Sequence, residues 1–227
     1  MTINRQILMK TRPVGMPTLE NFEIVESNIP EARHGEVLIK ILWLSLDPYM
    51  RGRMSKAKSY AASINEGDLI VGGAVGEVIN SHTPEYKKGD IVEGFTLGWQ
   101  EYAIANPTSI RKINPDIAPI QTAVGVLGMP GMTAFFGLLH VGKPIPGDTV
   151  VVSAASGAVG QLVGQIAKIG GCRVVGIAGG KEKCDYLTNT LNFDAAIDYK
   201  NENVDDMLDK YCPNGVNVYF DNVGGKI

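Results

Sequence analysis

A glycine-spaced segment halfway along the chain has the residue types of a phosphate-binding turn. Residues 149–155 are apolar and largely β-branched, which predicts a strand buried on both faces, and Gly157 and Gly160 follow it. Behind the glycines, apolar residues recur at helical spacing: Val159, Leu162, Val163, Ile166 and Ala167. Glycine lets a pyrophosphate approach the main chain, and the free N–H groups of a first helical turn bind the anion. Taken alone, this spacing fits a purely steric role of glycine in a strand–helix turn equally well.

The next predicted strand ends without the carboxylate that an NAD site uses. Residues 173–178 predict a short strand, and residues 179–183 then read Gly-Gly-Lys-Glu-Lys. NAD-binding folds carry an Asp or Glu at this strand tip for the ribose diol, whereas a 2′-phosphate is attracted by ammonium groups. The residues therefore favour NADP(H) over NAD(H). The alternative is that Lys181, Glu182 and Lys183 form only a solvated first helical turn.

Two further strands place polar side chains at the same sheet edge. Residues 195–199 and 216–221 predict strands, so Tyr199 and Asn222 come at the carboxyl edge, where open α/β sheets bind ligands. Taken alone, the pattern favours a surface aromatic at Tyr199 and a turn former at Asn222. Residues 119–142 are predicted to be helical, with Pro130-Gly131 dividing two apolar segments.

The first half of the chain has a different texture, because short extended runs alternate there with Gly, Pro, Asn and Asp. The predicted strands are residues 21–26, 36–46, 73–80, 90–95 and 99–105. They predict an antiparallel, barrel-like domain over residues 1–120, followed by a parallel α/β domain over residues 121–227. The expected fold class is therefore α/β, with an all-β domain first.

Composition excludes several classes of partner. The chain has 227 residues, 44% of them hydrophobic, which suffices for one large or two ordinary domains with apolar cores. A net charge of −3 gives no basic surface for nucleic acid. The cysteines are odd in number and widely spaced, at Cys172, Cys184 and Cys212, which fits a reducing compartment. No stretch approaches the ~20 apolar residues of a membrane span, so we expect a soluble, cytoplasmic protein.

Four segments in the same order resemble one known family. They are residues 46–54, 128–137, 154–160 and 220–225. Together they are similar to the zinc-independent medium-chain dehydrogenase/reductase family, and most of all to its branch of prostaglandin reductases, or leukotriene B4 12-hydroxydehydrogenases. These are NADPH-dependent alkenal/one oxidoreductases, and bacterial curcumin-reductase-like proteins are among them. The resemblance implies a GroES-like β-barrel domain that binds substrate, followed by a doubly wound Rossmann domain.

The resemblance also implies roles for particular residues. In the family, the residues that match Gly157, Ala158, Val159 and Gly160 hold the pyrophosphate. Those that match Lys183, Tyr199 and Asn222 contact the cofactor, Lys183 at the 2′-phosphate. The nicotinamide lies near Met129 and Thr133, at the break between the two linker helices, and Tyr49 lies in the substrate cleft. These last three also fit ordinary packing roles: a buried methionine, a helical threonine and a core tyrosine.

The usual zinc ligands are missing from the sequence. Zinc-dependent relatives use a Cys and a Gly-His-Glu segment in the first domain, but residues 1–171 contain no cysteine and the matching stretch 72–77 reads Gly-Gly-Ala-Val-Gly-Glu. The three histidines, His34, His82 and His140, lie far apart in the sequence. We therefore expect no metal, and a hydride addition from NADPH to the β-carbon of an α,β-unsaturated ketone or aldehyde.

The predicted sheet stops early, because the doubly wound fold has six strands and this chain ends just past the fourth. Family members continue further and supply the last strands, a tyrosine at the substrate carbonyl and the dimer contact. We expect an N-terminal part of a homodimeric enzyme, with little or no turnover of its own. Alternatives are an NADPH:quinone oxidoreductase and a non-catalytic NADPH-binding relative. A methyltransferase is disfavoured by the missing acid after residues 173–178.

Overall fold

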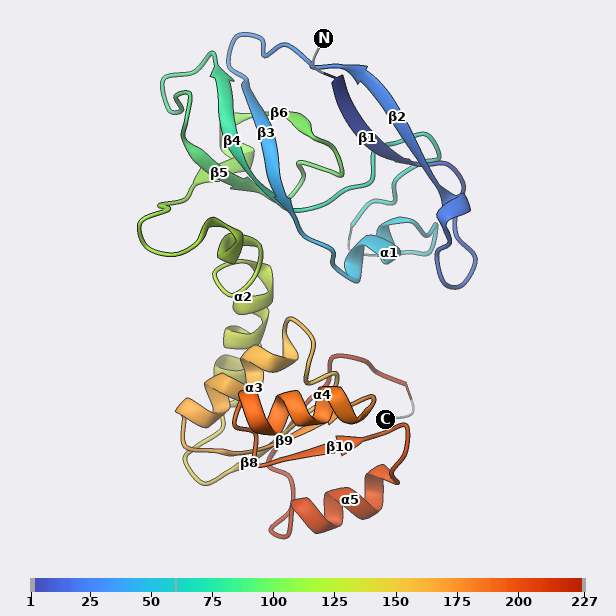
Figure 1. Ribbon diagram of the computed structural model, residues 1–227, viewed down its shortest axis with the longest axis vertical. Helices are drawn as coiled ribbons and strands as arrows, with labels where there is room; N and C mark the ends of the chain where they lie inside the picture. The colour runs from blue at the N-terminus through green and yellow to red at the C-terminus, as the bar shows by residue number, and fades with distance from the viewer. Residues whose placement is uncertain (1–2, 60, 226–227) are drawn as a thin grey trace. The chain divides into compact units, whose positions relative to one another are not determined.

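The computed structural model describes residues 3–59 and 61–225 and divides between Val124 and Gly125 into two compact units (Figure 1). The outermost residues of the two expected domains, 1–2 and 226–227, lie outside the described part. The predicted α/β class is confirmed, with an antiparallel unit first and a parallel α/β unit second. None of the helices in the described ranges is long and apolar enough to cross a membrane.

The first unit contains a two-stranded and a five-stranded antiparallel sheet. The small sheet pairs β1 (Ile3–Met9) with β2 (Phe22–Asn28). The large sheet has the order β6 (Tyr102–Ala105), β3 (Val37–Leu44), β4 (Ala74–Ser81), β5 (Ile91–Gly94) and β7 (Ile110–Lys112). The inward side chains of this sheet, including Val37, Ile39, Val78 and Val92, form its core. The unit's short helices are η1 (Leu19–Asn21), α1 (Tyr49–Arg53), η2 (Pro107–Ser109) and η3 (Ile120–Val124).

The strand β1 was not predicted, because its sequence Ile-Asn-Arg-Gln-Ile-Leu-Met mixes polar and apolar residues on both faces. The buried side chain of Asn4 holds β1 beside β6. Its amide nitrogen donates to Tyr102 O at 3.0 Å, and its amide oxygen accepts from Tyr102 N at 2.9 Å. One side chain thus replaces a missing pair of backbone hydrogen bonds and ties β1 to β6.

The second unit holds a parallel sheet with helices on both faces. Its order among the described residues is β10 (Ala195–Asp198), β9 (Arg173–Ala178), β8 (Thr149–Val152) and β11 (Val218–Phe220). This is the order 3-2-1-4 of the doubly wound fold, whose ligands bind at the carboxyl ends beside the first strand.

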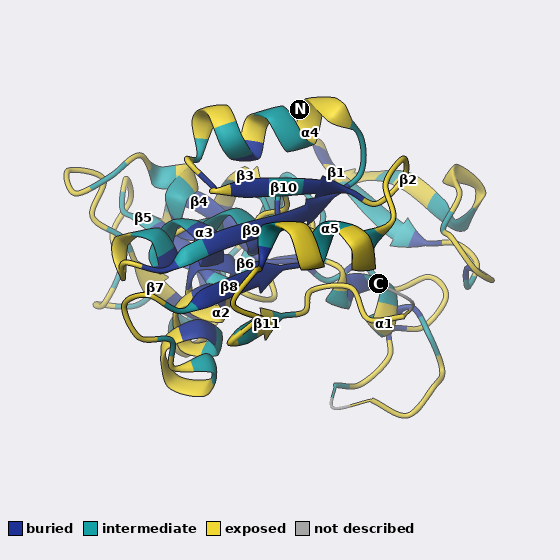
Figure 2. Ribbon diagram, turned by 90° about the horizontal axis from the view of Figure 1, so that it is seen from below, coloured by how far each residue is buried: buried dark blue, intermediate teal, exposed yellow. Residues whose placement is uncertain are grey.

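Alternating residues of the strands face two separate cores. Val150, Val152 and Val174 pack on the side of α3 (Gly160–Ile169), whereas Val151, Val175 and Ile177 pack on the side of α5 (Val204–Tyr211). Figure 1 shows α3 and α4 (Lys181–Asp185) on one side of the sheet and α5 on the other. The central strands are buried on both faces, while β11 is partly exposed (Figure 2). Burial on both faces is why their sequences read as continuous apolar runs.

The helical segment before the sheet differs from the prediction at Pro130. A division of two apolar segments at Pro130-Gly131 was expected, but both residues lie inside the first turn of α2 (Met129–Phe135). A first-turn proline costs no hydrogen bond, since its N–H would have no helical partner. The helix continues directly into the π-helix η4 (Phe136–Gly142), just as α4 continues into the π-helix η5 (Tyr186–Thr190). The expected break at Met129 and Thr133 is therefore wrong: the two residues share one helix.

Candidate nucleotide-binding site

The turn after β8 is built mainly from backbone. Strand β8 ends at Val152, three residues earlier than the predicted limit of residue 155, and the chain then turns until α3 begins at Gly160. Ala154 is left-handed, with φ 44°, and its carbonyl accepts the N–H of Gly157 at 2.9 Å. A Cβ on Gly160 would lie 2.4 Å from Ala154 O, so only glycine lets helix and strand approach this closely.

Three successive N–H groups of this turn are available to a ligand. Within the described chain, the N–H groups of Ala158, Val159 and Gly160 have no hydrogen-bond acceptor, and the bonds of α3 begin with Gln161 N–H on Gly157 O at 3.1 Å. The start of α3 therefore presents free donors together with the positive end of the helix dipole. This is the arrangement that binds a pyrophosphate.

A pocket of about 200 Å³ lies at the carboxyl ends of β8, β9 and β10. Three of the residues expected to bind a cofactor line it together: Gly157, Lys183 and Tyr199. Six residues that had not been proposed as ligands complete the lining: Ala154, Ser156, Ile177, Ala178, Gly179 and Val223. Most of them are small and apolar, so their side chains give no sign of a binding role. Only their positions at or just after the ends of predicted strands could have identified them from the sequence.

The two lysines of α4 differ in their surroundings. Lys181 Nζ donates to Asp185 Oδ2 at 2.6 Å, one helical turn further on. Lys183 Nζ has no hydrogen bond or ion pair with any other described residue, and Lys183 lines the pocket. Of these two lysines, Lys183 is therefore the one whose charge is free to attract an anion.

Asp198, at the end of β10, connects the turns that carry Lys183 and Tyr199. Its Oδ1 atom accepts the N–H of Gly180 at 2.7 Å and that of Lys200 at 3.1 Å, while Oδ2 accepts from Asn201 Nδ2 at 2.7 Å. These hydrogen bonds, first that of Asn201 and then that of Gly180, lower the pKa of Asp198. The buried carboxylate thus fixes both turns at the pocket.

Asn222 follows β11 and is held against the end of β8. Its backbone N–H donates to Ser153 Oγ at 2.7 Å, and its Nδ2 donates to Ser153 O at 2.9 Å. Ser153 Oγ in turn donates to Asp221 Oδ1 at 2.7 Å. The N–H groups of Val223 and Gly224 also point at Asp221 and lower its pKa to about 2. Asn222 does not itself line the pocket, but its neighbour Val223 does.

The remaining expected residues lie outside this pocket. Met129 and Thr133 are in α2 of the same unit, where Thr133 Oγ1 donates to Met129 O at 2.8 Å, and neither lines the pocket. Tyr49 begins α1 in the first unit and is half-buried. The structure brings together the pyrophosphate turn, Lys183 and Tyr199, and leaves the other assignments as proposals.

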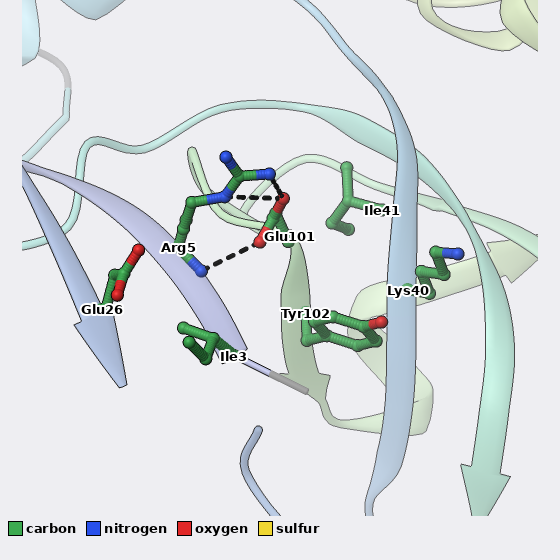
Figure 3. A pocket seen from close by; sticks show the side chains of 7 residues that line it. All are labelled: Ile3, Arg5, Glu26, Lys40, Ile41, Glu101 and Tyr102. Atoms are coloured by element: carbon green, nitrogen blue, oxygen red, sulfur yellow. Dashed lines mark hydrogen bonds and ion pairs between the residues drawn. The ribbon is translucent and has the colours of Figure 1, made fainter. Parts of the chain in front are cut away.

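The first unit has a larger and more open hollow, of about 530 Å³. It is lined by Ile3, Arg5, Glu26, Lys40, Ile41, Glu101 and Tyr102 (Figure 3). Arg5 binds Glu101 through its side chain at 2.6 and 3.0 Å and through its backbone N–H at 3.1 Å, and this lowers the pKa of Glu101. Since its central charges already neutralise one another and none of the expected residues lines it, the smaller pocket is the better candidate.

The described residues include no activated cysteine and no cluster of metal ligands. Burial raises the pKa of the thiols of Cys172, Cys184 and Cys212, so none of them is an activated thiolate. Within residues 3–59 and 61–225, no three His, Cys, Asp or Glu side chains lie close enough together to hold a metal ion.

Comparison with known proteins agrees with this geometry. Residues 5–113 match a family described as the N-terminal domain of oxidoreductase, and residues 158–227 match one described as zinc-binding dehydrogenase. The chain is 46% identical to the NADPH-dependent curcumin reductase of Escherichia coli (strain K12), over 99% of its own length and 65% of the relative's. It is 47% identical to the 2-alkenal reductase (NADP(+)-dependent) of Nicotiana tabacum, over 99% of the chain and 67% of the relative.

A solved structure has the same architecture. The crystal structure of CurA from Vibrio vulnificus in complex with NADPH matches with a TM-score of 0.92 and 50% identity, over 98% of this chain and 66% of that one. The chain thus spans about two thirds of the length of these relatives. With this degree of identity over nearly all of its residues, the chain belongs to the medium-chain dehydrogenase/reductase superfamily, in the alkenal and prostaglandin reductase branch that includes CurA.

Proposed function

We propose that the pocket at the carboxyl ends of β8, β9 and β10 binds NADPH, and that the protein reduces the carbon–carbon double bond of α,β-unsaturated ketones or aldehydes. The observation that carries the proposal is the lining of one pocket by Gly157, Lys183 and Tyr199 at a strand tip, Gly179, that has no carboxylate. The names of the curcumin and 2-alkenal reductases support the same cofactor and the same type of reaction.

Different residues of the chain bind different parts of NADPH. The N–H groups of Ala158, Val159 and Gly160 receive the pyrophosphate, and Lys183 neutralises the 2′-phosphate. Tyr199 contacts the adenosine end. Asn222, whose amide oxygen has no partner within the described chain, offers an acceptor beside the turn. Met129 and Thr133 contact the nicotinamide end, and Tyr49 contributes to the substrate cleft.

The reaction needs positioning and charge stabilisation. Bound NADPH supplies a hydride, which adds to the β-carbon of the substrate as the double-bond electrons move to the carbonyl oxygen. The protein holds the two reactants in contact, and hydrogen-bond donors stabilise the enolate oxygen. A proton from solvent then adds to the α-carbon of the enolate, and the carbonyl group re-forms. No ligand set for a Lewis-acid metal exists among the described residues, which suits a substrate that is already electrophilic.

A substrate panel tests the proposal. NADPH absorbance is followed with a medium-chain 2-alkenal, an enone and 1,4-benzoquinone, in the presence of protein whose intact mass has been verified. Preferred loss of absorbance with the alkenal or enone supports the proposed reaction. Preference for benzoquinone favours an NADPH:quinone oxidoreductase. NADPH binding without turnover of any of the three indicates a non-catalytic relative only if a protein with the full length of the relatives also shows no turnover.

A further inference from the structure

The strand tip at Gly179 is covered by side chains from the neighbouring turn. A Cβ on Gly179 would lie 2.9 Å from Tyr199 Cε1, from Tyr199 Oη and from Lys200 Cε. The tyrosine ring and the end of the lysine side chain therefore occupy the space that a side chain at the tip of β9 would need. In NAD-binding relatives of this fold, that space belongs to the carboxylate that binds the ribose.

The ammonium group of the lysine that covers Gly179 has no hydrogen-bonded or ion-paired partner among the described residues. This residue, Lys200, is exposed. Asp198 interacts with Lys200 through charge, but the hydrogen bonds that its oxygens accept come from N–H groups. Glu202 Oε2 accepts the N–H of Asp198 at 2.8 Å. Lys181, in contrast, is paired with Asp185.

Resting on the proposed binding of NADPH, we propose that Lys200 is a second determinant of specificity for the 2′-phosphate, acting with Lys183. Its Cε atom lies over Gly179, where an NAD-specific acid would stand, and the proposal places its ammonium group on the same phosphate, although Lys200 does not itself line the pocket. Gly179 is required because any larger residue displaces Lys200 and Tyr199. Asp198 is the positioning residue, since it holds the N–H of Gly180 and the N–H of Lys200 on one carboxylate oxygen.

Direct binding of NADPH and NADH, measured by fluorescence titration, tests the proposal without any need for turnover. Lys200→Gln is expected to weaken NADPH about fivefold, as for an exposed charge contact, and to leave NADH within about twofold. Lys181→Gln, a change of the same type at a paired lysine on the adjacent helix, is expected to leave both affinities unchanged.

Gly179→Ala tests the steric part. No positive φ is recorded at Gly179, and the atoms in the way are the ends of exposed side chains, so we expect a folded variant. The variant should weaken NADPH by displacing Lys200. The double variant Gly179→Ala, Lys200→Gln should then lose little more than Gly179→Ala alone.

The possible outcomes separate this inference from the proposed function. If Lys183→Gln lowers NADPH affinity selectively while Lys200→Gln has no effect, or weakens NADPH and NADH equally, Lys200 has no role at the 2′-phosphate and the inference is wrong. Additive losses in the double variant would contradict the steric role of Gly179. If the unchanged protein binds neither nucleotide, the proposed function itself is wrong.

Discussion

The two turns at the pocket are made in different ways. The turn after β8 uses main-chain N–H groups and glycines, so it depends on close packing. Its donors would bind the pyrophosphate of NADPH and that of NADH equally well. The second part of the site uses side chains instead: Lys183 in α4, which follows β9, and Tyr199 in the turn after β10. The comparison teaches that one turn should decide whether a dinucleotide binds, and the other which dinucleotide binds.

Each turn is nevertheless fixed by an aspartate at the end of the neighbouring strand in the sheet. Asp221, at the end of β11, holds Ser153 and thereby the start of the first turn. Asp198, at the end of β10, holds Gly180 in the second. Both carboxylates have a lowered pKa because they accept hydrogen bonds, several of them from backbone N–H groups. The two parts of the site are therefore rigid for the same physical reason, although they differ in what they recognise.

The largest effect is expected from Gly160→Ala. Its Cβ would lie 2.4 Å from Ala154 O and 2.8 Å from Ala155 Cα, and backbone atoms cannot move aside easily. We expect a loss of about 2 kcal/mol in unfolding free energy and of at least about tenfold in affinity for NADPH and NADH alike. Urea denaturation and nucleotide titration measure the two effects.

Gly170→Ala is the matched control, because Gly170 caps the same helix with φ −73° and its nearest Cβ contact would be at 3.3 Å. It should change stability and binding little. If Gly160→Ala were to affect only one of the two nucleotides, the first turn would take part in discrimination and the contrast between the turns would fail.

The second prediction concerns the preference of the site for NADPH over NADH. Lys183→Glu places a negative charge beside the 2′-phosphate and should weaken NADPH by roughly 1–3 kcal/mol, the range of a lost charge-assisted contact. NADH, which lacks this phosphate, should be affected much less. The measurement is the ratio of the two dissociation constants. An equal loss for both nucleotides would show that Lys183 is a surface residue without a role in specificity.

The third prediction concerns how the contribution of Asp221 to stability depends on pH. The folded pKa of Asp221 is about 2, below the ~3.9 of an unfolded aspartate. Because the folded value is the lower one, Asp221 stabilises the fold above about pH 4, and this contribution is lost as the pH falls towards 2. Asp221→Asn should lower the urea midpoint at pH 6, and the difference from the unchanged protein should narrow at pH 3. A difference that stays constant would contradict the assignment.

The smallest effect is expected from removal of metal ions, which should change neither nucleotide affinity nor activity. If both turns hold the nucleotide with backbone and lysine groups alone, treatment with a strong chelator followed by dialysis should leave NADPH affinity and any enone reduction unchanged. Activity that disappears and returns with zinc would show that a metal takes part, contrary to the donor set of the described residues.

The sequence predicted the turn built on glycine better than the turn built on side chains. Apolar runs marked β8 to β11, and Gly157 and Gly160 marked the close turn between β8 and α3, since both signals are local; its binding of a pyrophosphate remains a proposal. The lining by Gly179, the support of two turns by Asp198 and the proposed role of Lys200 were not recognised, because they arise between segments about twenty residues apart and no local pattern encodes them. Strand β1 was missed for a related reason, since Asn4 pairs with Tyr102, 98 residues away. The break expected near Met129 and Thr133 followed from treating a first-turn proline as a helix breaker.

The position of β11 has a consequence for the order of folding. β8 and β9 are joined by a single helix and can pair early, whereas Val218 of β11 pairs with Val150 of β8 across 68 residues of chain. Loops of this length close slowly relative to local contacts. We therefore expect the hydrogen bonds of Ser153 with Asp221 and Asn222 to form after β8 and β9 have paired. The turn between β8 and α3 would then take shape before the contact that holds it in place.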